Sequence, residues 1–386
     1  MRDVYLDYAA ATPLDEDVLQ EMMPYLGVCF YNPSAPYAHG REARVGLSKA
    51  RGRIAKVLGA RPGCITLTAG ATEANNIVFA SVRGDVACSA IEHESVLACV
   101  ENRGGRLIEV DTEGTVTPRA VREVVGPTTE LVSIGLANGE IGTVQSMRAI
   151  ADVVREERMR RLEEGDRKPL LLHTDATQAA GFLSLNVSGL GVDLMTLSAA
   201  KIYGPKQVGL LWHAEGVALS PLVRGGGQES GVRSGTENVA GAAGFARALE
   251  IAEGLRQAES ARLATLSRQL RDGISAEVAD AVFSGPRKAK LRLPGLVHVS
   301  FPGVEARRLV IALERMGVSV GTGSACAANR MRMSHVLVAI GLDERVASGS
   351  LRVTMGRSTT ADDVAYAVRA IVTCVRQERE RVGERG

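Results

Sequence analysis

One arrangement recurs between about residue 60 and residue 215 of the sequence. A short apolar run is followed by a polar cluster and then by a helix-like or looped stretch, as in GDVACSAI, ELVSIGLA, PLLLH and VDLMTLS. Strands that alternate with helical stretches predict βαβ units around a mostly parallel sheet. Ligands of such sheets bind beyond the carboxyl ends of the strands. We therefore expect an α/β fold with a ligand site at that edge.

Residue types that serve in catalysis follow these apolar runs. They are His93, Asn138, Asp175, Gln178 and Lys201. Because the carboxyl ends of parallel strands lie along one edge of a sheet, we expect these side chains to form a single site.

The length of the chain and a change of pattern indicate more than one domain. At 386 residues the chain is too long for one simple core. After about residue 255 the pattern changes to short strand-like runs, LVHVSF, GVSVG and GSLRVTMG, joined by helix-like connections. We predict a large domain over 13–255 and a smaller α+β domain formed by 1–12 and 256–386.

Composition and charge argue against several kinds of protein. The chain is 45% hydrophobic and 23% charged, with a net charge of only +2, which is typical of a globular protein and not of one that mainly binds nucleic acid or anionic membranes. No apolar run is long enough to span a bilayer, and MRDVYLDYAAATP has no signal-peptide core. The six cysteines form no CxxC pair and no zinc-type cluster. We expect reduced thiols, a cytoplasmic location, and neither a metal site nor direct binding to nucleic acid or membranes.

Lys201 and Asp175 together suggest a particular cofactor. Lys201 lies among small residues in TLSAAKIYGPK, and a desolvated lysine can lose its proton and form a Schiff base. By itself it could equally be a surface or salt-bridged lysine. Asp175 could be a helix cap, yet an aspartate is also the group that keeps a pyridinium nitrogen protonated. A lysine Schiff base with an aspartate on the ring nitrogen is what pyridoxal phosphate requires.

Such a cofactor also needs a phosphate site and a residue over its ring. In TAGATEANN, the stretch from Gly70 to Thr72 lies at the expected start of a helix, where backbone amides and the helix dipole bind phosphate. Ser198 and Thr236 are further hydroxyl candidates. His93 could stack on the ring and move protons, or it could be structural.

Two residues nearer the C-terminus could act on a substrate. Cys326, in GTGSACAANRMRM, has small neighbours, and Arg330 and Arg332 would favour its thiolate; alternatively it is an ordinary loop cysteine. Arg352, in SLRVTMGRS, could bind a substrate carboxylate through two parallel hydrogen bonds, or could form an internal salt bridge.

At this point the chain resembles a known family, the cysteine desulfurases of the nitrogenase-type and housekeeping iron–sulfur class. The resemblance runs nearly from end to end through YLDYAAATP, YNPSAPYAHG, AGATEANN, EHESV, ANGEIGTVQ, HTDATQAAG, SAAKIYGPKQVG, GGGQESGVRSGTEN, GSACAAN and LRVTMGRSTT. It implies the fold type I architecture of pyridoxal phosphate enzymes, with a seven-stranded type of sheet in the large domain.

The resemblance also implies a role for each matching residue. Lys201 would carry the cofactor, Asp175 would hold its pyridine nitrogen, Gln178 would contact its phenolic oxygen, and His93 would stack on its ring. The other implied positions are Ala71, Thr72 and Ser198 at the phosphate, Thr236 at the phosphate of the other subunit of a homodimer, Asn138 at the cofactor and with Arg352 at the substrate carboxylate, and Cys326 as the persulfide carrier.

Three positions depart from the family pattern. Ala200 stands where a phosphate-binding histidine is usual, and losing that charge-assisted hydrogen bond would cost about 1–3 kcal/mol of cofactor binding. Gly139 replaces a second asparagine and Ala69 replaces a serine. We expect weaker cofactor retention but not its loss.

The implied activity converts L-cysteine to L-alanine and passes the sulfur to an acceptor protein. Iron–sulfur assembly, tRNA thiolation and DNA phosphorothioation all use such a donor, and the sequence does not choose among them. The alternatives are a selenocysteine lyase or a related lyase or aminotransferase, and a non-catalytic scaffold with a decayed site.

Overall fold

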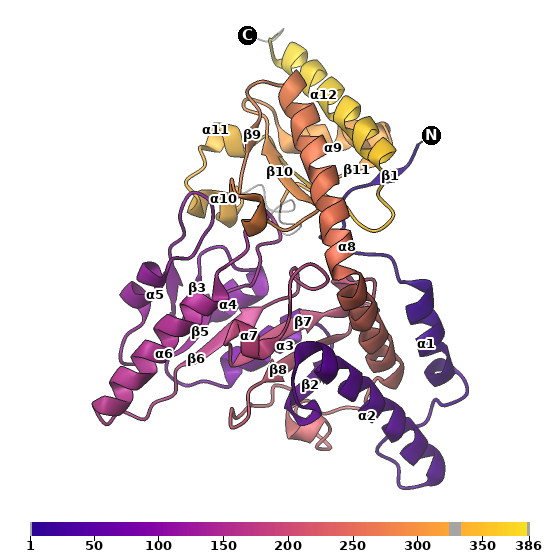
Figure 1. The fold of residues 1–386 in the computed structure, drawn as a ribbon, viewed down its shortest axis with the longest axis vertical. Helices are drawn as coiled ribbons and strands as arrows, with labels where there is room; N and C mark the ends of the chain where they lie inside the picture. The colour runs from indigo at the N-terminus through magenta and orange to yellow at the C-terminus, as the bar shows by residue number, and fades with distance from the viewer. Residues whose placement is uncertain (1, 324–332, 384–386) are drawn as a thin grey trace.

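The computed structural model describes residues 2–323 and 333–383, and its largest element is a seven-stranded sheet (Figure 1). The strand order is β2-β8-β7-β6-β5-β3-β4. The strands are β2 (Ile65–Thr68), β3 (Asp85–Ser89), β4 (Arg106–Ile108), β5 (Thr129–Ser133), β6 (Leu171–Asp175), β7 (Leu194–Ser198) and β8 (Gly209–His213). Within this sheet β8 alone runs in the direction opposite to the other strands. The predicted α/β fold with a mostly parallel sheet is confirmed.

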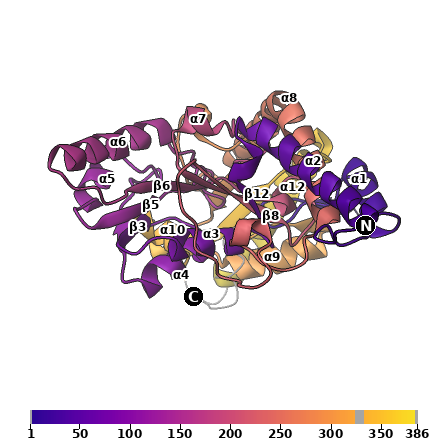
Figure 2. The same cartoon turned by 90° about the horizontal axis from the view of Figure 1, so that it is seen from below.

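Helices cover both faces of this sheet (Figure 2). One face packs against α2 (Ala38–Leu58), α5 (Pro118–Val124), α6 (Met147–Glu163), α7 (Val187–Leu190) and the first part of α8 (Val239–Glu277). The other face packs against α3 (Ala71–Ala80) and α4 (Glu94–Asn102). Burial on both faces explains why the strand sequences are nearly continuous apolar runs.

A second, smaller sheet lies apart from the first. Its three antiparallel strands, in the order β12-β10-β9, are β9 (Val282–Phe283), β10 (Leu296–Ser300) and β12 (Ser350–Thr354). Beside it, β1 (Val4–Tyr5) pairs in parallel with β11 (Val318–Ser319). The apolar core of this part also contains residues of α9 (Ala306–Arg315), α12 (Ala361–Gly383) and the second part of α8.

The long helix α8 connects the two parts (Figure 1). Up to Ala252 its buried residues belong to the core of the large sheet, and from Leu263 they belong to the core of the small sheet. The domain boundary predicted between residues 255 and 256 therefore falls inside one continuous helix.

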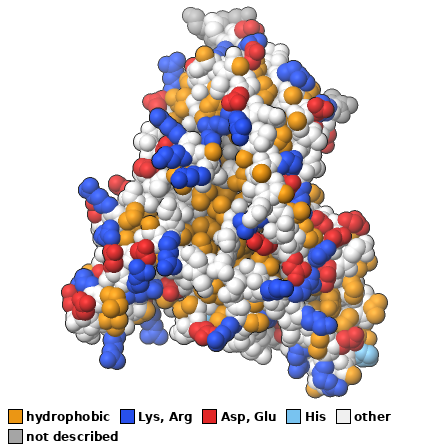
Figure 3. All heavy atoms as spheres, in the orientation of Figure 1, with side chains coloured by type: hydrophobic (Ala, Val, Ile, Leu, Met, Phe, Trp, Pro, Cys, Tyr) orange, Lys and Arg blue, Asp and Glu red, His pale blue; other side chains and the backbone are white. Residues whose placement is uncertain are grey.

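The remaining described elements are short or peripheral. They are α1 (Glu16–Leu26), α10 (His335–Ala339), α11 (Glu344–Ala347), η1 (Pro62–Cys64), η2 (Ala199–Lys201), η3 (Glu229–Gly231) and η4 (Ala289–Leu291). Hydrophobic side chains gather in a hollow between the upper and lower parts of the molecule (Figure 3). Across the described residues, none of the helices has the length and apolar character needed to cross a membrane.

Candidate active site

Lys201 lies in a turn that the N-terminal segment holds in place. It ends η2, directly after β7, and its Nζ donates a 2.5 Å hydrogen bond to the carbonyl of Ala10. The hydroxyl of Thr12 donates to the carbonyl of Ala200 at 3.1 Å and accepts from the amide of Tyr203 at 2.8 Å. The segment YLDYAAATP thus fixes the backbone on both sides of the lysine.

The surroundings of Lys201 lower the pKa of its amine. Burial lowers the pKa of Lys201, and the charge of Arg352 lowers it further, whereas Asp7 and Asp175 act in the opposite direction. A lysine with a lowered pKa spends more time as the unprotonated amine that attacks a carbonyl carbon.

Asp175, at the end of β6, is held by neutral donors at both oxygens. Oδ2 accepts from Nδ2 of Asn75 at 2.9 Å, and Oδ1 accepts from the amide of Thr177 at 2.9 Å. Asn75 is fully buried in α3. Because neither donor is a cation, the charge of the carboxylate is available to balance a positive charge on a ligand.

His93 is joined to Asp175 by hydrogen bonds. It is the N-cap residue of α4, where Nδ1 accepts from the amide of Ser95 at 3.1 Å and lies 2.9 Å from the Ser95 hydroxyl. That hydroxyl accepts from Nδ2 of Asn75 at 2.9 Å. The structure therefore brings His93 and Asp175 into one network, although the strand ends that carry them are far apart in sequence.

The start of α3 offers backbone amides at the same edge of the sheet. The helix begins at Ala71 after Gly70, and within the described residues no side chain caps this end, so its first amides have no partner in the helix. A side chain at Gly209 would come within 2.6 Å of the Gly70 backbone, so glycine lets β8 close against this turn. Gly209 pairs with Ser198 across the sheet. Ser198 therefore shares an edge with Ala71 and Thr72, as expected of a phosphate site.

These groups fit pyridoxal phosphate. Lys201 supplies the amine, Asp175 a carboxylate held by neutral donors, and the first turn of α3 a set of amides suited to a phosphate. At Ala200, where the resemblance expects histidine, the side chain has no donor. The weaker cofactor retention expected from it stays a prediction.

The Asn138 side chain organises the loop that follows β5. Its Nδ2 donates to the carbonyl of Ile91 at 2.9 Å, and its Oδ1 accepts from the amides of Glu140 and Ile141, both at 2.9 Å. Its predicted contacts with cofactor and substrate remain predictions.

Gln178 lies between this loop and the N-terminal segment. Its Nε2 donates to the carbonyl of Ala9 at 3.1 Å. A side chain at Gly139 would come within 2.9 Å of Gln178, so the departure from asparagine at this position gives the glutamine room. Its predicted contact with the phenolic oxygen stays a prediction.

Arg352 is buried on β12 and points its guanidinium toward the large sheet's loops. Its Nη2 forms a 2.8 Å salt bridge with Asp7, and its Nη1 donates to the carbonyl of Gly139 at 3.2 Å. Within the described part of the chain its Nε has no partner. The internal salt bridge that the sequence left open as an alternative is therefore present. It does not use every donor of the guanidinium, so a substrate carboxylate could still bind.

Cys326, with Arg330 and Arg332, lies outside the described residues. The described residues on either side reach the site: Gly321 pairs with Arg352, and the Ser334 hydroxyl donates to Glu140 at 2.9 Å. Burial raises the pKa of the Glu140 carboxyl to about 7.

Thr236 is exposed on the loop before α8, and no hydrogen bond among the described residues joins it to the other predicted positions. Its place at a partner's phosphate stays a prediction.

Sequence reasoning did not single out Asn75, Ser95 or Asp7. All three lie in stretches that carried the resemblance, AGATEANN, EHESV and YLDYAAATP. The available signal was a polar residue within a segment expected to be buried. That signal does not identify the partner, because Asp7 and Arg352 are 345 residues apart.

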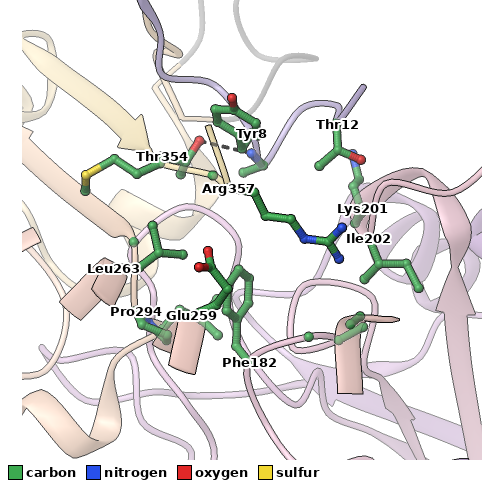
Figure 4. A pocket seen from close by; sticks show the side chains of 18 of the residues that line it. Tyr8, Thr12, Phe182, Lys201, Ile202, Glu259, Leu263, Pro294, Thr354 and Arg357 are labelled. Carbon is green, nitrogen blue, oxygen red and sulfur yellow. Dashed lines mark hydrogen bonds between the residues drawn. The ribbon is translucent and has the colours of Figure 1, made fainter. Parts of the chain in front are cut away.

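A cavity of about 60 Å³ lies beside Lys201, between the two parts of the molecule (Figure 4). Of the predicted site residues that the structure describes, Lys201 and Gln178 alone line it. Figure 4 shows Arg357 reaching across it above Glu259 and Phe182. The guanidinium of Arg357 stacks 4.1 Å from the centre of the Tyr203 ring. The cavity is thus a neighbour of the cofactor site and not the site itself.

Comparisons with known proteins identify the family and its fold. The Aminotransferase class-V family matches residues 4–366. The sequence is 39% identical over 379 residues to the cysteine desulfurase IscS of Dictyoglomus turgidum, covering 95% of this chain and 93% of that protein. The fold is similar to a NifS-like protein, with a TM-score of 0.87, 32% identity, and coverage of 96% and 99% of the two chains. It is also similar to SspA in complex with cysteine, with a TM-score of 0.75, 30% identity, and coverage of 91% and 98%.

Proposed function

The chain belongs to the aminotransferase class-V family, and from that membership we propose that it is a pyridoxal-phosphate-dependent cysteine desulfurase. It converts L-cysteine to L-alanine and transfers the sulfur, through a persulfide on Cys326, to an acceptor. The observation that carries the proposal is the presence, at the carboxyl ends of neighbouring strands, of a half-buried lysine of lowered pKa and an aspartate whose two oxygens are held by neutral donors.

The residues of the large sheet hold the cofactor. Lys201 would hold it covalently, Asp175 would pair with its ring nitrogen, and Ala71, Thr72 and Ser198 would bind its phosphate. When bound, pyridoxal phosphate supplies an electron sink for the bonds that change at the substrate's carbon atoms. The remaining implied contacts are His93 over the ring, Gln178 and Asn138 at the cofactor, and Thr236 from the second subunit of a homodimer.

The substrate end of the site uses residues from the small sheet and its neighbouring loops. Arg352 binds the α-carboxylate together with Asn138. Lys201, as a free amine, takes the Cα proton. The thiolate of Cys326 attacks the substrate sulfur, a sulfur–sulfur bond forms as the carbon–sulfur bond breaks, and the three-carbon product is protonated to L-alanine.

The sulfur acceptor is a protein of iron–sulfur assembly, tRNA thiolation or DNA phosphorothioation. The similarity to both IscS and SspA supports a sulfur donor without choosing among these pathways. We also propose a cytoplasmic location.

The test is the release of L-alanine from L-cysteine by the purified protein with excess pyridoxal phosphate and a thiol reductant. We expect alanine from the wild type, and none from Lys201→Ala or Cys326→Ala. Cys29→Ala serves as the matched thiol control and should retain activity, because Cys29 has no place in the site. Bound cofactor without alanine would contradict the proposal, and a strict preference for selenocysteine or a need for an amino acceptor would favour the alternatives.

A further inference from the structure

A continuous hydrogen-bonded chain runs from Asp175, at the end of β6, to His93, at the start of α4. Asn75 donates to Asp175 and to Ser95 through the same Nδ2, both at 2.9 Å. Ser95 in turn contacts His93 Nδ1 through its hydroxyl at 2.9 Å and its amide at 3.1 Å. Asn75 and Ser95 are both buried, so water competes little for these bonds.

The direction of every bond in this chain follows from the chemistry of its ends. A carboxylate only accepts, so the end of the Asn75 amide that faces Asp175 is its NH2 group. The same NH2 faces Ser95, whose hydroxyl oxygen accepts it and whose hydrogen is then directed to His93. The Ser95 amide can only donate, so Nδ1 of His93 carries no proton; the Ser95 hydroxyl is a second donor to the same lone pair, and the proton of the neutral ring lies on Nε2.

We propose that Asn75 and Ser95 are positioning residues that link Asp175 to His93 and hold His93 as a hydrogen-bond donor at Nε2. The inference rests on the proposed function, in which His93 acts next to the substrate sulfur. Held in this way, His93 does not take the thiol proton at Nε2. Instead it stabilises the substrate sulfur once that sulfur is a thiolate, because an N–H donor strengthens its bond to an acceptor that gains negative charge.

The direct test is nitrogen NMR of the holoenzyme labelled with ¹⁵N-histidine. The chain has six histidines, and the His93→Gln spectrum identifies the signals of His93. We expect Nδ1 to show the shift of an unprotonated, hydrogen-bonded nitrogen and Nε2 that of a protonated one. In Ser95→Ala the two shifts should move part of the way toward their average, because the hydroxyl is lost while the backbone amide at position 95 still donates to Nδ1; in Asn75→Ala, which keeps both donors, the movement should be smaller. A wild-type spectrum with the proton on Nδ1 would overturn the proposal.

The kinetic test uses adjacent asparagines of one helix. Asn75→Ala and Ser95→Ala should each lower kcat for alanine formation by about tenfold with little change in KM, because each removes two hydrogen bonds of the chain. Ser95→Thr, which keeps the hydroxyl, should restore most of kcat. Asn76→Ala is the matched control and should match the wild type, since the hydrogen bond that the Asn76 side chain makes among the described residues is to the carbonyl of Thr72, within its own helix.

The cofactor absorbance and the Tm of each variant are also measured. A lower kcat with unchanged absorbance and Tm indicates a positioning role, whereas a fall in either indicates a folding defect. Equal kcat values for Asn75→Ala, Ser95→Ala and Asn76→Ala, with cofactor bound in all three, would overturn the proposal. If the wild type forms no alanine, the proposed function fails, and the NMR measurement still decides whether the chain sets the tautomer of His93.

Discussion

The two faces of the small sheet differ sharply in chemistry, although both are buried. On one face Val297, Val299, Phe301, Leu351 and Val353 pack into the apolar core with α8 and α12. On the other face, apart from Leu296, the side chains of β10 and β12 are polar: His298, Ser300, Ser350, Arg352 and Thr354. The first face stabilises the fold, whereas the second supplies the group expected to hold the substrate. One strand of alternating residues thus serves both purposes.

Some polar side chains on this face have hydrogen-bond partners among the described residues, and others do not. The hydroxyls of Ser300 and Ser350 bond each other at 2.7 Å. His298 lies directly opposite Arg352, is fully buried, and has no partner for either ring nitrogen within the described residues. Such a concentration of unpaired polar atoms beside one arginine is typical of a functional site and costly for a core.

The largest expected effect is on the free energy of unfolding, and it comes from truncating a side chain on the apolar face. Leu351→Ala should lower the free energy of unfolding by about 3 kcal/mol, because it removes a fully buried side chain and leaves a cavity. Denaturant unfolding measures this loss. The folded protein should keep the wild-type KM for L-cysteine. A change in KM as large as that caused by Arg352→Lys would show that the two faces are not separate in function.

The next effect comes from the neighbouring residue on the polar face. Arg352→Lys should lower kcat/KM for L-cysteine by about 100-fold, because a lysine cannot make two parallel hydrogen bonds to a carboxylate. Steady-state kinetics measures this change, and the unfolding free energy should fall by less than in Leu351→Ala. An unchanged kcat/KM would contradict the carboxylate-binding role of Arg352.

The smallest effect concerns pH. Burial, and then the charge of Arg352, lower the pKa of His298 to about 3 from its ordinary 6.5. The unfolded chain therefore binds a proton that the folded chain does not, and stability falls as pH drops below 6.5. His298→Leu should remove this loss, which amounts to about 2 kcal/mol at pH 5. Unfolding curves of both proteins at pH 7.5 and pH 5 measure it. Equal losses on acidification would show that His298 becomes charged in the folded protein.

The large sheet, and the placement of the site at the carboxyl ends of its strands, were predictable from the sequence. The reason is that β5, β6 and β7 are apolar runs followed by polar residues. Lys201 and Asp175 follow from that pattern directly. The roles of the other predicted site residues came from the resemblance, and the structure of one chain leaves several of them as predictions.

The networks behind those residues were not predictable in the same way. The pattern of LVHVSF is equally compatible with a strand that has one face in water, yet both faces of this strand are buried. On the polar face, Arg352 of the neighbouring strand contacts Gly139 in the loop after β5. Asn75 sits in a helix, where sequence alone does not say which strand end it will meet. Hydrogen bonds between residues so far apart are fixed by the packing of whole elements, and a local pattern does not contain that information.

The helix α8 has a mechanical consequence for the enzyme. At 39 residues and a rise of 1.5 Å each, it is about 58 Å long, and it contains no proline. Its first part packs in the core next to Lys201, and its second part packs in the core next to Arg352. It therefore joins the two cores rigidly. A hinge motion that separated the two parts would require this helix to bend, which would break some of its backbone hydrogen bonds. The distance between amine and guanidinium is accordingly set before any substrate arrives, and little of the binding energy is spent on bringing them together.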